Sequence, residues 1–298
     1  MYYVNGHYVK EADAKISILD LAVLRGFGVF DYLRTYGGRP FHLWDHLLRL
    51  QYSAQHVGLS LPKTLSEIQE IIENLKKQDE VSIKIILTGG VSPDHFTLHQ
   101  SNLIVFAYPP TPYPDSYYTE GIKVTTTRLS RPLPSSKTTQ YAPAIVAMQQ
   151  GKAQEALYLN SQDEILEATT SNFFAFKDDT LYTCTSEEVL IGITLEVILR
   201  LCASHFPIER RALSTQDIPH MQEAFITASN KEVMPVVQID GKKVGNGKVG
   251  PRTKKIMELF HAYTQSAHWP LLNIPRYISK NPDFDRQPFL SCGNLDVS

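Results

Sequence analysis

Ser135-Ser136-Lys137-Thr138-Thr139-Gln140-Tyr141 is the stretch around which the rest of the chain is organised. A polar helical run and an apolar, strand-like segment at residues 155–159 follow it. The next segment is Ile165-Leu166-Glu167-Ala168-Thr169-Thr170-Ser171-Asn172, which leads into a run of phenylalanines. A lysine, a tyrosine just after it, and a glutamate one helix and one strand later are therefore flanked by small residues.

These three side chains could together hold a pyridine aldehyde. A lysine bonds covalently to the aldehyde carbon, a glutamate pairs with the ring nitrogen, and a tyrosine reaches the phenolic oxygen of the ring. The roles would belong to Lys137, Glu167 and Tyr141. Most lysines are simply exposed, so the rest of the chain must supply the other parts of a site.

Length and composition predict an ordinary globular protein. The 298 residues, 33.7 kDa in all, are enough for two domains with cores of their own. A hydrophobic content of 43%, a charged content of 20% and a net charge of -2 are typical of soluble chains. No basic run indicates a nucleic-acid partner, and no apolar run is long enough to span a membrane.

The cysteines and the first residues bear on location. Cys184, Cys202 and Cys292 are odd in number and far apart, which indicates free thiols. The N-terminus has no basic-then-apolar signal pattern. A cytoplasmic location is therefore expected.

Residues 1–108 are predicted to form a small α/β domain. Thr64-x-x-Glu67 is a capping box that starts one helix, and an apolar period from Leu43 to the stop signal Gly58 indicates another. The predicted strands and hairpins lie at residues 2–9, 29–43, 83–88 and 103–108.

A proline-rich stretch predicts an interdomain linker at 109–121. Residues 122–264 then form a larger, β-rich domain, with a final helix that begins at Pro251. Its predicted strands and hairpins lie at 122–127, 155–159, 173–184, 224–227 and 236–244. Residues 265–298 have no period and are expected to be an extension of unknown role.

A phosphate could be bound without a metal at a helix N-terminus, where free N–H groups and the helix dipole favour an anion. Leu190-Ile191-Gly192-Ile193-Thr194 predicts such a helix start, with a glycine that permits close approach. Arg49 could add a planar cation and Ser229 a hydroxyl. Each of these features alone is common in ordinary helices and turns.

Other chemistries find less support. His42 and His46 are four residues apart, but His42 precedes the helix and no third metal ligand is evident, so no metal is predicted. Gly89-Gly90 is followed by a turn instead of a helix, which argues against a nucleotide phosphate loop. No Gly-x-Ser-x-Gly elbow or Cys-His nucleophile pair stands out.

The order of these motifs resembles the class IV, or fold type IV, pyridoxal-phosphate enzymes. That family includes branched-chain aminotransferases, D-amino acid aminotransferases and 4-amino-4-deoxychorismate lyase. The resemblance runs from about residue 3 to residue 260. It rests on residues 24–31, 46–50, 137, 166–172, 192–194, 232–236 and 247–253.

The resemblance implies an α+β fold of two domains with pyridoxal 5'-phosphate between them. It also implies a homodimer whose active site is completed by a loop of the other subunit. Lys137 is similar to the catalytic lysine that holds the cofactor. The remaining cofactor-binding positions that it implies are Glu167, Tyr141, Arg49, Leu190, Ile193, Thr194 and Ser229.

The implied reaction is a ping-pong transfer of an amino group from an amino acid to a 2-oxo acid. The implied substrate-binding positions are Arg25, Phe30, Arg34, His95 and Asn230. Phe30 and Arg34 match branched-chain enzymes, whereas Asp94 replaces an arginine of the D-amino acid enzymes, so branched-chain-type substrates are favoured. A D-amino acid aminotransferase, a lyase and a non-catalytic cofactor-binding scaffold remain the alternatives.

Overall fold

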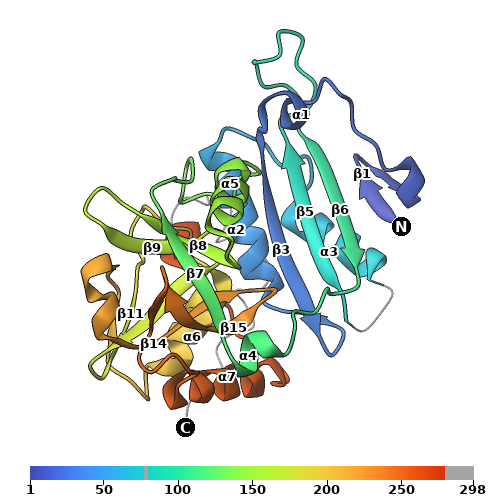
Figure 1. Ribbon diagram of the computed structural model, residues 1–298. Coiled ribbons are helices and arrows are strands. Elements are labelled where there is room, and N and C mark those ends of the chain that lie inside the picture. The colour runs from blue at the N-terminus through green and yellow to red at the C-terminus, as the bar shows by residue number, and fades with distance from the viewer. Residues whose placement is uncertain (77–79, 279–298) are drawn as a thin grey trace.

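The computed structural model describes residues 1–76 and 80–278 of the chain (Figure 1). Its first sheet has the strand order β2-β1-β6-β5-β3-β4, and every neighbouring pair is antiparallel. The strands are β1 (Tyr2–Val4), β2 (His7–Val9), β3 (Gly28–Tyr36), β4 (Arg39–Pro40), β5 (Ser82–Thr88) and β6 (Asn102–Tyr108).

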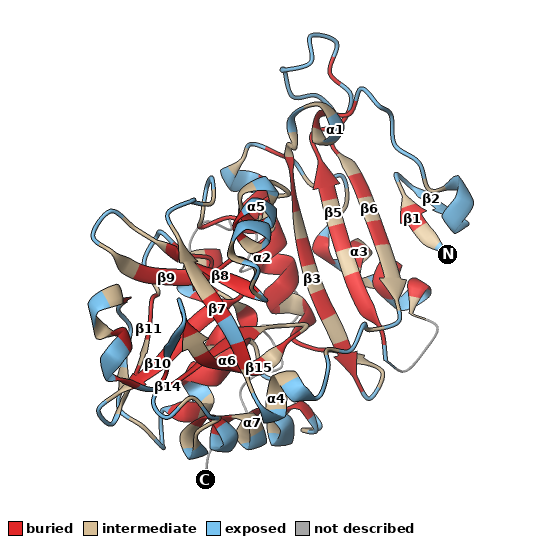
Figure 2. Cartoon of the chain, in the orientation of Figure 1, coloured by how far each residue is buried: buried red, intermediate tan, exposed pale blue. Residues whose placement is uncertain are grey.

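Two helices cover one face of this sheet. Helix α2 (Leu43–His56) packs against β3, and α3 (Leu65–Leu75) packs against β1 and β6. Alternate residues of β5, such as Ile83 and Ile85, are buried toward the helices. The intervening side chains, such as Lys84, belong to the opposite face, where Lys84 lines a pocket shared with the second half of the chain. Figure 2 shows buried and intermediate positions alternating along β5.

The second sheet is larger and mixed, with the order β12-β11-β10-β14-β15-β7-β8-β9-β13 and with β16 paired to β15. The pairs β15–β7, β7–β8 and β11–β12 are parallel. Its strands are β7 (Ile122–Thr127), β8 (Glu155–Leu159), β9 (Glu164–Ala168), β10 (Asn172–Lys177), β11 (Thr180–Thr183), β12 (Ile208–Glu209), β13 (Leu213–Ser214), β14 (Met221–Ala228), β15 (Glu232–Ile239) and β16 (Lys242–Lys243).

Helices connect and cover the second sheet. Helix α5 (Ala142–Gly151) is the crossover between the parallel strands β7 and β8, while α6 (Ile193–Cys202) and α7 (Pro251–Thr264) pack near β14. The short helices are η1 (Glu11–Asp13), α1 (Leu21–Arg25), α4 (Ser116–Thr119), η2 (Thr215–His220) and α8 (Pro275–Ile278). No helix in the described ranges has the length and apolar character needed to cross a membrane.

The predictions that rest on turn residues and helix caps are confirmed. Thr64 and Glu67 form both bonds of the predicted capping box. Asn5 and Gly6 both have positive φ, as the predicted tight hairpin requires. The α+β fold class is confirmed as well, with one antiparallel and one mixed sheet.

The second strand of the hairpin predicted at residues 29–43 was misplaced. Strand β4 ends at Pro40, and His42 adopts a left-handed conformation, with φ of 48°, at the N-cap of α2. The apolar residues that suggested a strand, Phe41 and Leu43, are buried on either side of this turn. Hydrophobicity alone could not separate a strand end from a helix start here.

The larger of two apolar clusters crosses the predicted domain boundary. The larger apolar cluster joins Leu47 and Ile85 from the first half of the chain with Phe174 and Phe260 from the second. The smaller cluster lies within the second half, around Leu157 and Ile226. The boundary at residues 109–121 therefore stays a prediction.

The chain after α7 continues along the molecular surface up to residue 278. Leu272, Ile274 and Tyr277 are buried there, although the segment has no regular period. Residues 279–298 of the predicted extension, Cys292 among them, lie outside the described residues. Cys184 and Cys202 are buried free thiols, as predicted.

Candidate active site

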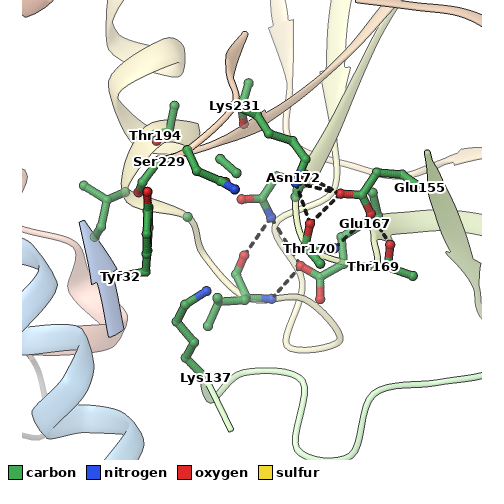
Figure 3. Close-up of a pocket in the computed structure, with 18 of the residues that line it drawn as sticks. Tyr32, Lys137, Glu155, Glu167, Thr169, Thr170, Asn172, Thr194, Ser229 and Lys231 are labelled. Carbon is green, nitrogen blue, oxygen red and sulfur yellow. Dashed lines mark hydrogen bonds and ion pairs between the residues drawn. The ribbon is translucent and has the colours of Figure 1, made fainter. Parts of the chain in front are cut away.

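A pocket of about 440 Å³ lies between the two sheets. Lys137 reaches into it from its lower edge, Glu167 from the right, and Thr194 and Ser229 lie at its upper left (Figure 3). The pocket also brings together most of the other predicted residues, namely Phe30, Arg49, Tyr141, Leu190, Ile193 and Asn230.

The loop that carries Lys137 is held by the first sheet. The carbonyl of Lys137 accepts a hydrogen bond from the Phe30 amide at 2.9 Å, and the Thr139 amide donates to the Gly28 carbonyl at 2.9 Å. The Lys137 amide also donates to Ser53 Oγ on α2 at 3.1 Å. Residues 137–139 therefore pair with the start of β3 through an antiparallel bridge between Val29 and Thr138, which fixes where the lysine side chain begins.

The environment of Lys137 favours the neutral amine. Its Nζ lies 4.9 Å from the centre of the Phe30 ring. Desolvation in the pocket, together with the nearby positive charges of Arg49 and Arg131, lowers the pKa of Lys137 to about 7. A neutral amine can attack a carbonyl, so this lysine is suited to act as a nucleophile or a base near neutral pH.

Glu167 is a buried carboxylate whose two oxygens have different surroundings. Its Oε2 accepts hydrogen bonds from the Leu190 amide at 3.2 Å and from Asn172 Nδ2 at 3.4 Å. Its Oε1 has no hydrogen-bond partner in the part of the chain that the structure describes, although Arg131 Nε lies 3.6 Å away as an ion pair. Burial raises the pKa of Glu167 to about 7.

Arg49 is held rigidly by a buried carboxylate. Asp31 on β3 accepts from Arg49 Nε and Nη2, both at 2.8 Å, and contacts His46 Nδ1 at 2.6 Å. Although burial opposes its charge, Arg49 and His46 hold the pKa of Asp31 well below its usual range. His46 therefore contacts the Asp31 carboxylate of this ion pair, while His42 contacts Asp45 and Tyr263. No group of metal-ligating side chains is found within residues 1–76 and 80–278.

The N-terminus of α6 forms another edge of the pocket. Its N-cap is Gly192, which has no side-chain capping bond, so the first amides of the helix remain available. A Cβ atom at Gly192 would clash with Asn172 Oδ1, so only glycine fits. The buried hydroxyls of Thr194 and Thr227, both lining the pocket, have no partner among the described residues.

Sequence reasoning missed a buried ion pair in the pocket wall. Lys231 Nζ lies 2.9 Å from Glu155 Oε1 and 2.7 Å from Thr170 Oγ1. Glu155 also accepts from the hydroxyls of Thr169, Thr170 and Ser171. Although burial opposes it, the charge of Lys231 lowers the pKa of Glu155. The available signal was a glutamate that begins the otherwise apolar strand β8.

Several further pocket residues also went unpredicted. Tyr32 and Lys84 lie directly opposite each other on β3 and β5, and Tyr108 lies on β6 of the same sheet. Burial lowers the pKa of Lys84, and no hydrogen bond or ion pair joins its ammonium to another described residue. A single lysine inside the apolar strand at 83–87 was the signal that could have revealed it. Tyr113 lines the pocket too, and its hydroxyl accepts from Asn230 at 2.9 Å.

Three predicted substrate-binding residues lie outside the pocket of this chain. Arg25 is exposed and its guanidinium stacks on the Phe96 ring. Arg34 pairs with Glu232 at 3.0 Å instead. His95 is exposed in the loop after β5.

The residues present fit pyridoxal 5'-phosphate, the cofactor that the resemblance implies. The unpartnered Oε1 of Glu167 could accept a hydrogen bond from a protonated ring nitrogen. The amides that begin α6, with the unpartnered hydroxyls of Thr194 and Thr227 and the charge of Arg49, suit a phosphate. The lowered pKa of Lys137 suits covalent capture of an aldehyde.

Comparison with known proteins agrees with this arrangement. Residues 28–239 match the family described as amino-transferase class IV. A Methanocaldococcus jannaschii protein assigned as a branched-chain-amino-acid aminotransferase is 31% identical over 271 residues, which cover 87% of this chain and 94% of that protein. The D-alanine aminotransferase of Staphylococcus haemolyticus is 29% identical over 278 residues, covering 89% and 98%.

Solved structures share the fold. The Escherichia coli branched-chain amino acid aminotransferase superposes with a TM-score of 0.83 at 24% identity, covering 91% of this chain and 97% of that one. The Thermoproteus uzoniensis branched-chain aminotransferase with norvaline has a TM-score of 0.79 at 24% identity, covering 93% and 97%. With its pocket, its fold and its family match in agreement, the chain belongs to the class IV aminotransferases.

Proposed function

We propose that this aminotransferase moves an amino group from an amino acid with a branched, apolar side chain to a 2-oxo acid in two half-reactions. The observation that carries the proposal is one pocket containing both Lys137, with a pKa lowered to about 7, and Glu167, with an unpartnered buried oxygen. Class IV aminotransferases are pyridoxal phosphate enzymes, and this pair is what that cofactor needs.

The cofactor would be held by what we call the cofactor wall, formed by Lys137, Glu167, Ile193, Thr194, Thr227 and Ser229. Lys137 would bind the aldehyde carbon and Glu167 the ring nitrogen. The amides of Ile193 and Thr194 and the charge of Arg49 would bind the phosphate. Tyr141, whose ring lies 5.6 Å from that of Phe30, would face the phenolic oxygen, and Leu190 the apolar side of the ring.

When bound, pyridoxal phosphate supplies a ring that stabilises negative charge at the substrate Cα. Glu167 Oε1 would accept the N–H hydrogen bond of the ring nitrogen and so keep that ring protonated. Asn172 and the Leu190 amide hold the carboxylate in place by donating to its other oxygen, Oε2. Lys137 would be the base that removes the Cα proton. Its low pKa leaves it neutral and able to accept that proton at physiological pH.

Substrate choice would depend on the substrate wall, which we define as Phe30, Tyr32, Lys84 and Tyr108 of the first sheet. Three aromatic rings favour an apolar side chain. Lys84 has no partner of opposite charge within the described ranges, so it can bind the substrate carboxylate. Asn230 lies at the pocket edge beside Tyr113 and can add a hydrogen bond.

Two alternatives share the cofactor wall. A D-amino acid aminotransferase is supported by the relatives of that activity at 29–30% identity. A lyase of the aminodeoxychorismate type would use the same cofactor but would expel pyruvate without an amino acceptor. Formation of a new amino acid only when a 2-oxo acid is supplied separates both aminotransferases from the lyase.

We further propose a homodimer in the cytoplasm. Arg25 and His95 are exposed on one rim together with the apolar side chains of Val23, Val91 and Phe96. Burial of that rim by a second subunit would cover the apolar side chains and could bring Arg25 and His95 to the partner's pocket. The free thiols of Cys184 and Cys202 suit a reducing compartment.

The test is a visible spectrum of the purified protein with pyridoxal phosphate, before and after addition of single L- and D-amino acids. An absorption band that one enantiomeric series of branched-chain amino acids abolishes supports the proposal and reports the substrate's handedness. A band that responds only to D-alanine or its homologues would favour the D-amino acid alternative. A protein that develops no band would overturn the proposed function.

A further inference from the structure

The segment after α7 packs against the loop that forms one side of the candidate active site. It lies beyond the family match at residues 28–239, and it ends in the short helix α8. Tyr277 and Ile274 are buried in the same apolar cluster as Ile191 and Ile193 of the site. The segment therefore packs directly against the loop that leads into α6.

Polar contacts bind this segment to the loop at residues 185–191. Arg276 donates to the Val189 carbonyl at 2.8 Å and to the Ser186 carbonyl at 3.0 Å. Tyr277 donates to the Ile191 carbonyl at 2.5 Å. These carbonyls belong to irregular backbone outside any strand or helix, so side-chain donors such as these satisfy them.

The same segment is anchored to α2, which carries Arg49. The Leu272 amide donates to Asp45 Oδ1 at 2.9 Å, and the Tyr277 ring lies 5.3 Å from that of Tyr52. Helix α2 and the loop before α6 come from opposite halves of the chain. The C-terminal segment therefore contacts both elements that would bind the cofactor phosphate.

The Ile191 carbonyl is the point where the contacts meet. It accepts the short hydrogen bond from Tyr277, and Arg49 Nη1 lies 3.5 Å from the same oxygen. Ile191 is only two residues before Ile193, whose amide begins α6. Burial raises the pKa of Tyr277, so its hydroxyl remains a donor throughout the working pH range.

We propose that Tyr277 and Arg276 are positioning residues of the phosphate site, fixing the N-terminus of α6 opposite Arg49. This inference rests on the proposed cofactor site. Without the Tyr277 hydroxyl, the Ile191 carbonyl would retain only the long contact to Arg49. The guanidinium and the helix amides could then move apart, and the phosphate would lose part of its binding energy.

The experiment measures binding to the apoenzyme of Tyr277→Phe for three probes: pyridoxal phosphate, inorganic phosphate and pyridoxal without phosphate. We expect the dissociation constants of the first two to rise by about three- to tenfold, the range of one buried hydrogen bond. The constant for pyridoxal should not change, because the effect is confined to the phosphate end. At saturating cofactor, kcat should match wild type.

Tyr263→Phe is the matched control, since Tyr263 also hydrogen-bonds through its hydroxyl, to His42 at 2.9 Å, and within the described residues no hydrogen bond joins that hydroxyl to the loop. It should leave all three dissociation constants unchanged. If Tyr277→Phe does not fold, Arg276→Met removes the neighbouring contacts to Val189 and Ser186 and carries the same expectation.

The two proposals fail in different ways. A wild-type protein that takes up no pyridoxal phosphate overturns the proposed function. A wild type that binds it and a folded Tyr277→Phe with unchanged phosphate affinity, whatever its thermal stability, overturns only the positioning role. Equal weakening of all three probes would also overturn it, because that result indicates a general loss of structure.

Discussion

The cofactor wall and the substrate wall face one another across a single pocket but are built differently. The cofactor wall presents polar atoms whose hydrogen-bonding capacity is unused within the described chain, such as Glu167 Oε1 and Thr194 Oγ1. The substrate wall is mostly ring surface with one cation, Lys84. Under the proposed function, the cofactor wall would specify the chemistry and the substrate wall the choice of substrate. The two walls would then change separately except at Phe30, whose ring lies 4.9 Å from Lys137 Nζ.

The largest expected effect comes from the substitution that removes the reactive amine of the cofactor wall. Lys137→Ala should lower kcat by at least about 10⁴-fold, because both the covalent anchor and the base are lost. Steady-state kinetics measure the loss, and borohydride treatment followed by mass spectrometry should detect no trapped adduct. Lys123→Ala, an exposed lysine on β7, should behave as wild type. Retained turnover in Lys137→Ala would contradict the assignment of Lys137 as the covalent anchor and base of the cofactor wall.

A smaller loss is expected from Glu167→Gln. The amide cannot stabilise a protonated ring nitrogen, so kcat should fall by about 10²–10³-fold while the cofactor stays bound. Absorbance measures cofactor content and stopped-flow measures the half-reaction. Glu164→Gln, on the same strand but outside the pocket, is the control. An unchanged rate would mean that another group serves the ring nitrogen.

The pH dependence of cofactor capture tests the environment of Lys137. Only the neutral amine attacks, and desolvation lowers its pKa to about 7 from 10.5. The rate at which apoenzyme captures pyridoxal phosphate should therefore fall about tenfold per pH unit below pH 7 and stay level above it. Glu167 titrates in the same range, so Glu167→Gln should be measured alongside. A rate that keeps rising to pH 10 would contradict the lowered pKa.

The smallest effect concerns the substrate wall alone. Lys84→Met should raise KM about tenfold, the effect of losing one charge-assisted hydrogen bond, and leave cofactor affinity unchanged. Lys84→Arg should restore most of the KM because it keeps the charge. If Lys84→Met weakened cofactor binding as strongly as it weakened substrate binding, the two walls would not be independent.

The two walls also differ in how far the sequence predicted them. Every residue of the cofactor wall except Thr227 on β14 was predicted, because the order of the motifs that carry them resembles a known family. The substrate wall was predicted only at Phe30. Which side chains of β3 and β5 meet across the sheet depends on register, and the pairing of Tyr32 with Lys84 has no local signal.

The same limit explains the remaining differences. Arg34 shares a face with Tyr32, but it lies two residues, about 7 Å, further along the strand and reaches Glu232. Turns and caps such as Asn5-Gly6 and Thr64-Glu67 were predictable because their chemistry is local. The burial of Tyr277 was not, since its partners lie more than eighty residues away, at Ile191.

The attachment of the Lys137 loop to β3 has a consequence for how activity appears during folding. Thr139 Oγ1 bonds to the Gly26 carbonyl, 113 residues away. Contacts of such long range cost much chain entropy and form late. Neither half of the chain can align the lysine before the other half has docked. Regain of activity on refolding should therefore lag behind the return of secondary structure, and it would report the final assembly step.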